Sequence, residues 1–137
     1  MKKQKLRFEG FFEVDLTDEW IHEEDKGTVS IYKPDGYGAI TISVYRAPHE
    51  LNAREILIYI LGTHKIRYGA NDIKTKGNST YIKVKNPKHL KYKYWIFCIN
   101  VLNNRHLYLT YNSDNYSELG EAKDIILSAK ILNNDHS

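Results

Sequence analysis

Residues 27–48, GTVSIYKPDGYGAITISVYRAP, contain two short stretches in which apolar and polar side chains alternate. The apolar positions of these stretches are Val29, Ile31, Ile40, Ile42 and Val44. Alternation with a period of two is typical of β-strands that bury one face. The tripeptide Pro-Asp-Gly at 34–36 lies between the stretches and has the residue types of a tight turn. We therefore expect a β-hairpin, around which the other elements are arranged.

The length of 137 residues fits one domain. We expect that domain to cover residues 1–137, with the basic lead 1–7 and the polar tail 133–137 frayed. The single cysteine, Cys98, excludes an internal disulfide bond. The start of the chain has no apolar run of signal-peptide type, and no stretch approaches the length of a membrane span. These features predict a cytoplasmic protein that does not enter a membrane.

Further elements follow from periodicity and capping residues. Asn52, with Glu55 three residues later, is a good start for a helix, and a second helix is expected over residues 115–127 with Ser113 or Asp114 as its cap. The remaining strands are expected at residues 8–16, 73–76, 81–85, 91–102, 105–111 and 128–132. Short links between strands favour antiparallel pairing. We predict an α+β fold, with a largely antiparallel sheet of about six or seven strands and two main helices packed on it.

Several segments together carry a resemblance to a known fold group. They are FFEVDLTDEW, GTVSIYKPDG and GAITISVYRAP, then a helix, a strand meander ending in RHLYLTYNSD, and a final AKDIILSAKIL. In this order they resemble the Mog1/PsbP-like fold group, as an uncharacterised bacterial member. That group includes GTPase-binding factors, photosystem subunits and secretion adaptors, so the resemblance implies protein binding without catalysis. A shared fold does not by itself define the function.

No catalytic, cofactor or metal motif is visible in the sequence. The six histidines are scattered, without the i, i+4 spacing of a helical zinc site: His22, His49, His64, His89, His106 and His136. Cys98 lies in the middle of an apolar strand, where a cysteine is usually a small packed side chain. Gly36 and Gly38 lack the third glycine and the following helix of a phosphate-binding loop. We predict no catalytic residue, no cofactor and no metal.

Charge is distributed unevenly, although the net charge is only +3. Residues 13–25 carry seven acids and no Lys or Arg, a pattern that favours a solvated edge strand and turn over a cation site or docking patch. Residues 83–93 carry five lysines and no acid, interleaved with tyrosines. Lysines on a strand next to a turn are a common protection against edge-to-edge pairing. The same pattern also suits contacts with nucleic-acid phosphates and bases.

A second face of the expected sheet is rich in tyrosine. We expect five tyrosines to share it with Thr41, Ser43 and Thr110. Together with nearby lysines, the candidate partner-binding residues are Tyr32, Tyr45, Tyr92, Tyr94, Tyr108, Lys83, Lys85, Lys91 and Lys93. Either the C-terminal helix covers this face, or the face is open and recognises a partner through its rings.

Three functions remain open from the sequence. The first is a non-catalytic protein-binding or adaptor domain, with an immunity protein that masks a toxin as one version. The second is a nucleic-acid-binding domain that uses the Lys- and Tyr-rich residues 81–94. The third is an enzyme whose site is assembled only in three dimensions.

Overall fold

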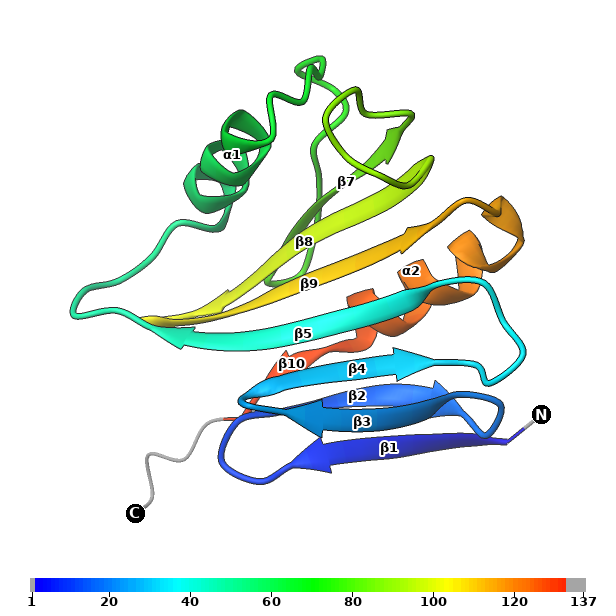
Figure 1. Cartoon of the computed structure of the whole chain (residues 1–137). Coiled ribbons are helices and arrows are strands. Elements are labelled where there is room, and N and C mark those ends of the chain that lie inside the picture. Colours follow the sequence, from blue (N-terminus) through cyan, green and yellow to red (C-terminus); the bar gives the residue numbers. More distant parts are fainter. Residues whose placement is uncertain (1, 133–137) are drawn as a thin grey trace.

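The computed structural model describes residues 2–132 (Figure 1). Its strands are β1 (Lys3–Phe8), β2 (Phe12–Thr17), β3 (Ile21–Asp25), β4 (Thr28–Tyr32), β5 (Ala39–Arg46), β6 (Lys74–Lys76), β7 (Ser79–Lys85), β8 (Tyr94–Leu102), β9 (Arg105–Ser113) and β10 (Lys130–Ile131). Its helices are α1 (Ala53–Thr63), the short 3₁₀ helix η1 (Tyr116–Glu118) and α2 (Leu119–Ser128). The expected frayed tail at 133–137 and His136 lie outside the described residues.

The described strands form two antiparallel sheets. The larger sheet has seven strands in the order β3-β4-β5-β9-β8-β7-β6, and the smaller one has the order β1-β2-β10. With its two helices, the chain therefore has the predicted α+β fold, made mostly of sheet. The central hairpin is β4 and β5, in which Val29 lies opposite Ile42 and Ile31 opposite Ile40. All four side chains are buried, as their alternation predicted.

The prediction that the basic lead is frayed is wrong for residues 3–7, because they belong to β1. In the register of β1 with β2, Lys5 lies opposite Asp15 and Arg7 opposite Glu13. The side chains of these pairs approach to 3.0 Å and 3.3 Å between nitrogen and oxygen. Cross-strand pairs of opposite charge stabilise a sheet. Glu13 and Asp15 thus pair with cations that precede them in the sequence, while Leu6 and Phe8 of β1 pack on the core.

The two helices lie on opposite faces of the large sheet (Figure 1). α2, behind the sheet in this view, buries Ala122, Ile125 and Ile126 in the same core as β2 and the hairpin. α1 buries Leu57 and Leu61 against β7 and β8 on the other face. Period-two alternation sends neighbouring side chains of β8 into different cores: Phe97 and Ile99 face α1, whereas Ile96 and Cys98 face α2.

The ends of the helices agree only partly with the sequence prediction. The Asn52 carboxamide oxygen accepts a hydrogen bond from the Glu55 amide at 3.0 Å, which confirms the predicted cap of α1. The predicted caps of the second helix, Ser113 and Asp114, are wrong. Asn115 caps η1 by accepting from the Ser117 amide, and Asp114 instead accepts from the Lys93 amide of the loop before β8. Sequence spacing could not reveal that Asp114 meets this distant loop.

A buried carboxylate ties the turn of the hairpin to the C-terminal helical segment. The Glu118 side chain is in the interior, with 3% of the residue exposed. It accepts hydrogen bonds from the amides of Tyr37 and Gly38, each at 3.1 Å, and from the Tyr111 hydroxyl at 2.9 Å. Three donors on one carboxylate satisfy most of its hydrogen-bonding capacity, so the buried charge is compensated.

Burial makes the core sensitive to alkaline pH. It raises the pKa of the Cys98 thiol from 9.0 to about 12 and the pKa of Tyr108 from 10.0 to about 12. Above pH 9 the unfolded chain therefore releases protons that the folded chain keeps, and stability falls as the pH rises. Each group contributes a slope of about 1.4 kcal/mol per pH unit between its two pKa values.

We expect the free energy of unfolding, measured by urea titration, to fall steeply between pH 9 and pH 11. A Cys98→Ala variant lacks the thiol and should lose about 1.4 kcal/mol less per pH unit over this range. The same slope in both proteins would contradict this assignment.

Candidate interaction face

The face of the large sheet on which α1 lies is only partly covered. α1 packs on β7 and β8, and the side chains of β4 and β5 on this face stay partly exposed. We call this uncovered area the open sheet face. It consists of Thr28, Ser30, Tyr32, Thr41, Ser43 and Tyr45. All six side chains carry a hydroxyl group, and none of them is charged.

Hydrogen bonds across the strands organise the open sheet face. The Thr41 and Thr110 hydroxyl oxygens lie 2.6 Å apart, and those of Thr28 and Ser43 lie 3.2 Å apart. A hydroxyl has one donor and two acceptor positions, so each pair keeps further positions for a partner. Because none of these groups is charged, a partner can form hydrogen bonds to this face without the cost of removing a charge from water.

Tyr45 is the most exposed ring of the open sheet face, with 48% of the residue accessible to solvent. It stacks on the His106 ring, with the ring centroids 5.0 Å apart and the planes 22° apart. The His106 Nδ1 atom is buried without a hydrogen-bond partner, and burial lowers the pKa of this imidazole. A neutral His106 therefore supports the Tyr45 ring as a flat, rigid platform of the kind that interfaces use.

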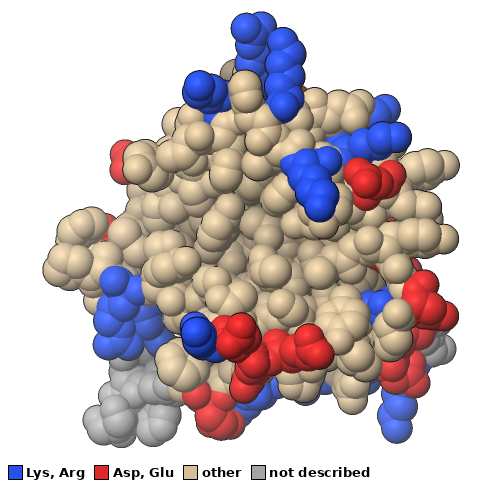
Figure 2. Space-filling view, viewed as in Figure 1, with Lys and Arg blue, Asp and Glu red and all other residues tan. Residues whose placement is uncertain are grey.

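The charged residues surround this face and leave its centre neutral. Figure 2 shows the centre without charged side chains, with acidic residues along the lower border and basic residues toward the upper border and the lower left. The lower border contains the edge strand β3, in which Glu23, Glu24 and Asp25 are exposed. The part of the acidic span that forms β3 solvates an edge strand, as predicted, whereas Glu13 and Asp15 lie on β2, the middle strand of the small sheet. Glu23 also raises the pKa of Tyr32 by accepting a hydrogen bond from its hydroxyl.

The candidate tyrosines do not share one face as predicted. Tyr32, Tyr45 and Tyr108 lie on the α1 side of the sheet, with Tyr108 partly buried under α1. Tyr94 lies in register with Ser113 on the opposite face, and Tyr92 precedes β8 in a loop, where its ring is 6.2 Å from that of Trp95. β8 begins at residue 94 and not at 91, which leaves Tyr92 outside the sheet. The register of β8 with β9 places Ile99 opposite Tyr108, so Tyr94, five residues away, lies on the other face.

The candidate lysines are also dispersed. Lys83 and Lys85 lie on β7 and share the α2 side of the sheet with Tyr94, whereas Lys91 and Lys93 belong to the loop before β8. β6 pairs only with Ser79, Thr80 and Tyr81, so the remainder of β7 is a free edge of the sheet. The structure thus places Lys83 and Lys85 at an edge, where charge opposes pairing with another chain. They are not part of the open sheet face.

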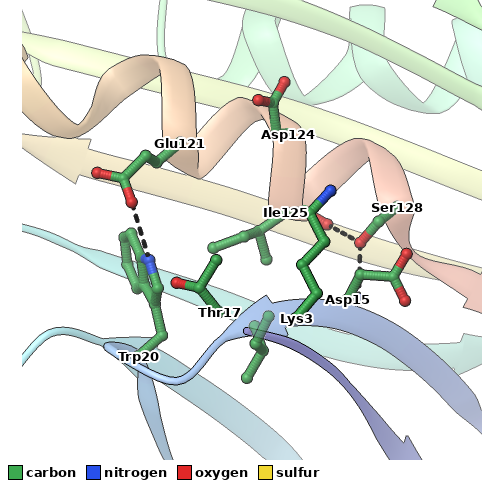
Figure 3. A pocket seen from close by; sticks show the side chains of 9 residues that line it. Lys3, Asp15, Thr17, Trp20, Glu121, Asp124, Ile125 and Ser128 are labelled. Carbon is green, nitrogen blue, oxygen red and sulfur yellow. Dashed lines mark hydrogen bonds between the residues drawn. The ribbon is translucent and has the colours of Figure 1, made fainter. Parts of the chain in front are cut away.

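A small cavity lies between α2 and β2 (Figure 3). Within it, the Trp20 indole donates to Glu121 at 3.4 Å, and Ser128 accepts from the Asp15 amide while donating to the Ile125 carbonyl. The Thr17 hydroxyl is buried there without a partner. The volume of the cavity, about 130 Å³, is well below the roughly 300 Å³ or more that is typical of small-molecule sites. The cavity is therefore a gap between α2 and the small sheet that is too small for such a ligand.

The titratable residues of the described chain do not form a metal-binding cluster. Within residues 2–132, no three side chains of His, Cys, Asp or Glu are grouped closely enough to hold a metal ion. Cys98 is fully buried, as its strand position predicted. His64 ends α1 and lies 6.0 Å from the Phe97 ring. In the part of the chain that the structure describes, neither helix has the length and apolar character that crossing a membrane requires.

Glu118 and the residues of β3 are the features that the sequence prediction missed. The glycine pair Gly36 and Gly38 was the available signal for Glu118, because both glycines leave room for its carboxylate and for Tyr111. In the sequence, glycines at this spacing indicate a turn alone. β3 has no alternation of apolar residues, so its pairing with β4 could not be derived from periodicity.

Comparison with known proteins supports the fold and no function. No family model matches the chain, and no curated protein matches it. The chain is similar to a crystal structure of a protein from Bacteroides thetaiotaomicron VPI-5482, with a TM-score of 0.64 and 14% sequence identity. The similarity covers 98% of this chain and 50% of the other, so this chain spans about half the length of its structural neighbour. At this identity the two proteins share a fold, and a shared fold leaves function open.

Proposed function

We propose that the protein is a non-catalytic binding domain that engages another protein through the open sheet face. The observation that carries the proposal is a hydroxyl-rich, uncharged surface on β4 and β5 that α1 leaves uncovered. Interfaces are depleted of charge at their centre and enriched in tyrosine. The partner that fits has a neutral, hydrogen-bonding patch for this centre and basic residues opposite the acids of β3. A cytoplasmic location and membership of the Mog1/PsbP-like group belong to the same proposal.

Site-specific photocrosslinking tests this function. A photoreactive amino acid at Thr41, in the middle of the open sheet face, should capture one predominant protein from cells of the source organism. The control is the same amino acid at Tyr59, a more accessible position on α1 with 73% of the residue exposed, so weaker capture there cannot be due to burial. Capture of the same protein in equal amounts from both positions would contradict the proposal, as would no capture from Thr41.

Tyrosine substitution should then weaken the captured complex. A Tyr32→Ala/Tyr45→Ala variant removes both rings of the open sheet face, and interface tyrosines of this kind contribute about 2 kcal/mol each. We expect the dissociation constant, measured by calorimetry, to rise at least tenfold, whereas Tyr59→Ala should leave it within twofold. If the face instead mediates self-association, crosslinking from Thr41 would give a product of two copies of this chain. That result would contradict the proposal of a different protein as the partner.

A further inference from the structure

A second, chemically different site lies at the end of the molecule where α1 ends. A cavity of about 430 Å³ is lined there by two segments that are distant in the sequence, 65–67 and 84–89. Its charged residues are all basic: Lys65, Arg67, Lys85 and Lys88. Asn86 and His89 add polar groups, and Ile66, Val84 and Pro87 add apolar surface. No acidic residue lines it.

Within the described residues, these cations have no counterion. Among residues 2–132, the ion pairs with Lys or Arg all involve Lys5, Arg7 or Lys33, at the other end of the fold. Lys85 lies on the α2 side of β7, so the positive potential at the concavity comes from Lys65, Arg67 and Lys88, and an anion relieves their mutual repulsion. The structure therefore keeps this charge available to a ligand.

The backbone around the cavity is ordered by local hydrogen bonds. At the end of α1, the amides of Lys65 and Ile66 donate to the carbonyls of Gly62 and Leu61 at 3.0 Å and 2.9 Å, with Lys65 at a φ of 56°. This arrangement is a Schellman motif, and it occupies carbonyls whose negative dipole would otherwise oppose an anion. On the other wall, Asn86 has a φ of 53° and its amide donates to the Lys93 carbonyl at 2.6 Å, which closes the loop 86–93.

We propose that this cavity binds the phosphate group of a small phosphate monoester of about mononucleotide size. The volume falls within the range of about 300–1,000 Å³ of small-molecule sites. Lysine and arginine from two walls can contact phosphate oxygens, and arginine can do so with two parallel hydrogen bonds. The apolar residues of the wall suit the non-ionic part of such a ligand. This site is independent of the open sheet face and does not rest on the function proposed for it.

A titration with adenosine monophosphate, followed by ¹H–¹⁵N NMR at low salt, tests the proposal. We expect saturable shifts at residues 65–67, 85, 86, 88 and 89, with inorganic phosphate causing weaker shifts of the same amides and adenosine, which lacks the phosphate, causing none. An Arg67→Gln/Lys88→Gln variant should raise the dissociation constant about tenfold or more, since two hydrogen bonds to charged groups are lost. The Arg67 and Lys88 side chains are both exposed, so the double variant should fold normally.

The matched control is Lys74→Gln/Lys76→Gln, which removes the same charge from the exposed strand β6 outside the cavity. It should leave the dissociation constant within twofold. Equal weakening in both variants would overturn the proposal in favour of general surface electrostatics. Absence of saturable binding would overturn it as well. An oligonucleotide that binds far more tightly than the mononucleotide, with shifts beyond the cavity, would replace it with an extended nucleic-acid surface.

Discussion

A Gly38→Ala variant should lose about 3 kcal/mol of unfolding free energy. A methyl group at this position would lie 2.3 Å from the Asn112 carbonyl oxygen and 2.7 Å from the Tyr111 ring. Both neighbours are held in place, because Asn112 is in β9 and the Tyr111 side chain is fully buried. The backbone of the turn must then move away from β9. Overpacking of this kind typically costs about 1–3 kcal/mol, and here it also disturbs the Glu118 hydrogen bonds.

Two other glycines provide the control for this substitution. Gly62 in α1 and Gly120 in α2 have no atom within 4 Å of an added methyl group. At such helical positions alanine is more stable than glycine by about 0.5–1 kcal/mol. Urea unfolding should therefore show Gly38→Ala and Gly62→Ala changing stability in opposite directions. A Gly38→Ala protein as stable as the wild type would show that the turn can relax without cost.

Replacement of Glu118 is expected to be the most destabilising change. In a Glu118→Ala variant, the amides of Tyr37 and Gly38 and the Tyr111 hydroxyl lose their acceptor together. A buried donor without an acceptor costs about 1–3 kcal/mol, so a total loss of about 3–5 kcal/mol is expected once partial solvation of the turn is allowed for. For a chain of this length, the melting temperature should fall by about 10 °C or more.

Glu121, three residues along on α2, separates this effect from a simple loss of charge. Its carboxylate accepts from Lys33 at 2.7 Å, and 44% of its side chain is exposed. The glutamine oxygen can still accept from the Trp20 indole, and the pair with Lys33 is partly exposed to solvent, so Glu121→Gln should cost at most about 1 kcal/mol. Glu118→Gln retains the shape but offers one acceptor oxygen in place of two, and its stability should lie between that of Glu118→Ala and the wild type. Equal stabilities for Glu118→Gln and Glu121→Gln would exclude the anchoring role.

Part of the candidate site could be predicted from local patterns. The hydroxyl side of β5 follows directly from alternation, so Thr41, Ser43 and Tyr45 were expected to lie on one face, and they do. The sharing of that face with Tyr94 could not be predicted reliably. The face on which Tyr94 lies depends on the register of β8 with β9. A shift of one residue in that register would move every side chain of β8 to the other face.

The basic cavity illustrates the opposite case. Residues 83–93 were visible as a basic span, but Lys65 and Arg67 are separated from them by β6 and part of β7. Only the packing of α1 on β7 and β8 brings the end of this helix to the loop 86–93. Contacts between distant segments depend on the closure of the whole fold and leave no periodic signal in the sequence.

The amino-acid sequence by itself determined the central hairpin, the cap of α1 at Asn52, the buried position of Cys98 and the α+β class. These features follow from side-chain periodicity and from hydrogen bonds between residues that are near each other in the chain. The tertiary structure alone decided which sheet face α1 leaves open, where Glu118 finds its three donors, and which cations share a cavity. The physical reason is that burial and charge pairing depend on which elements pack together.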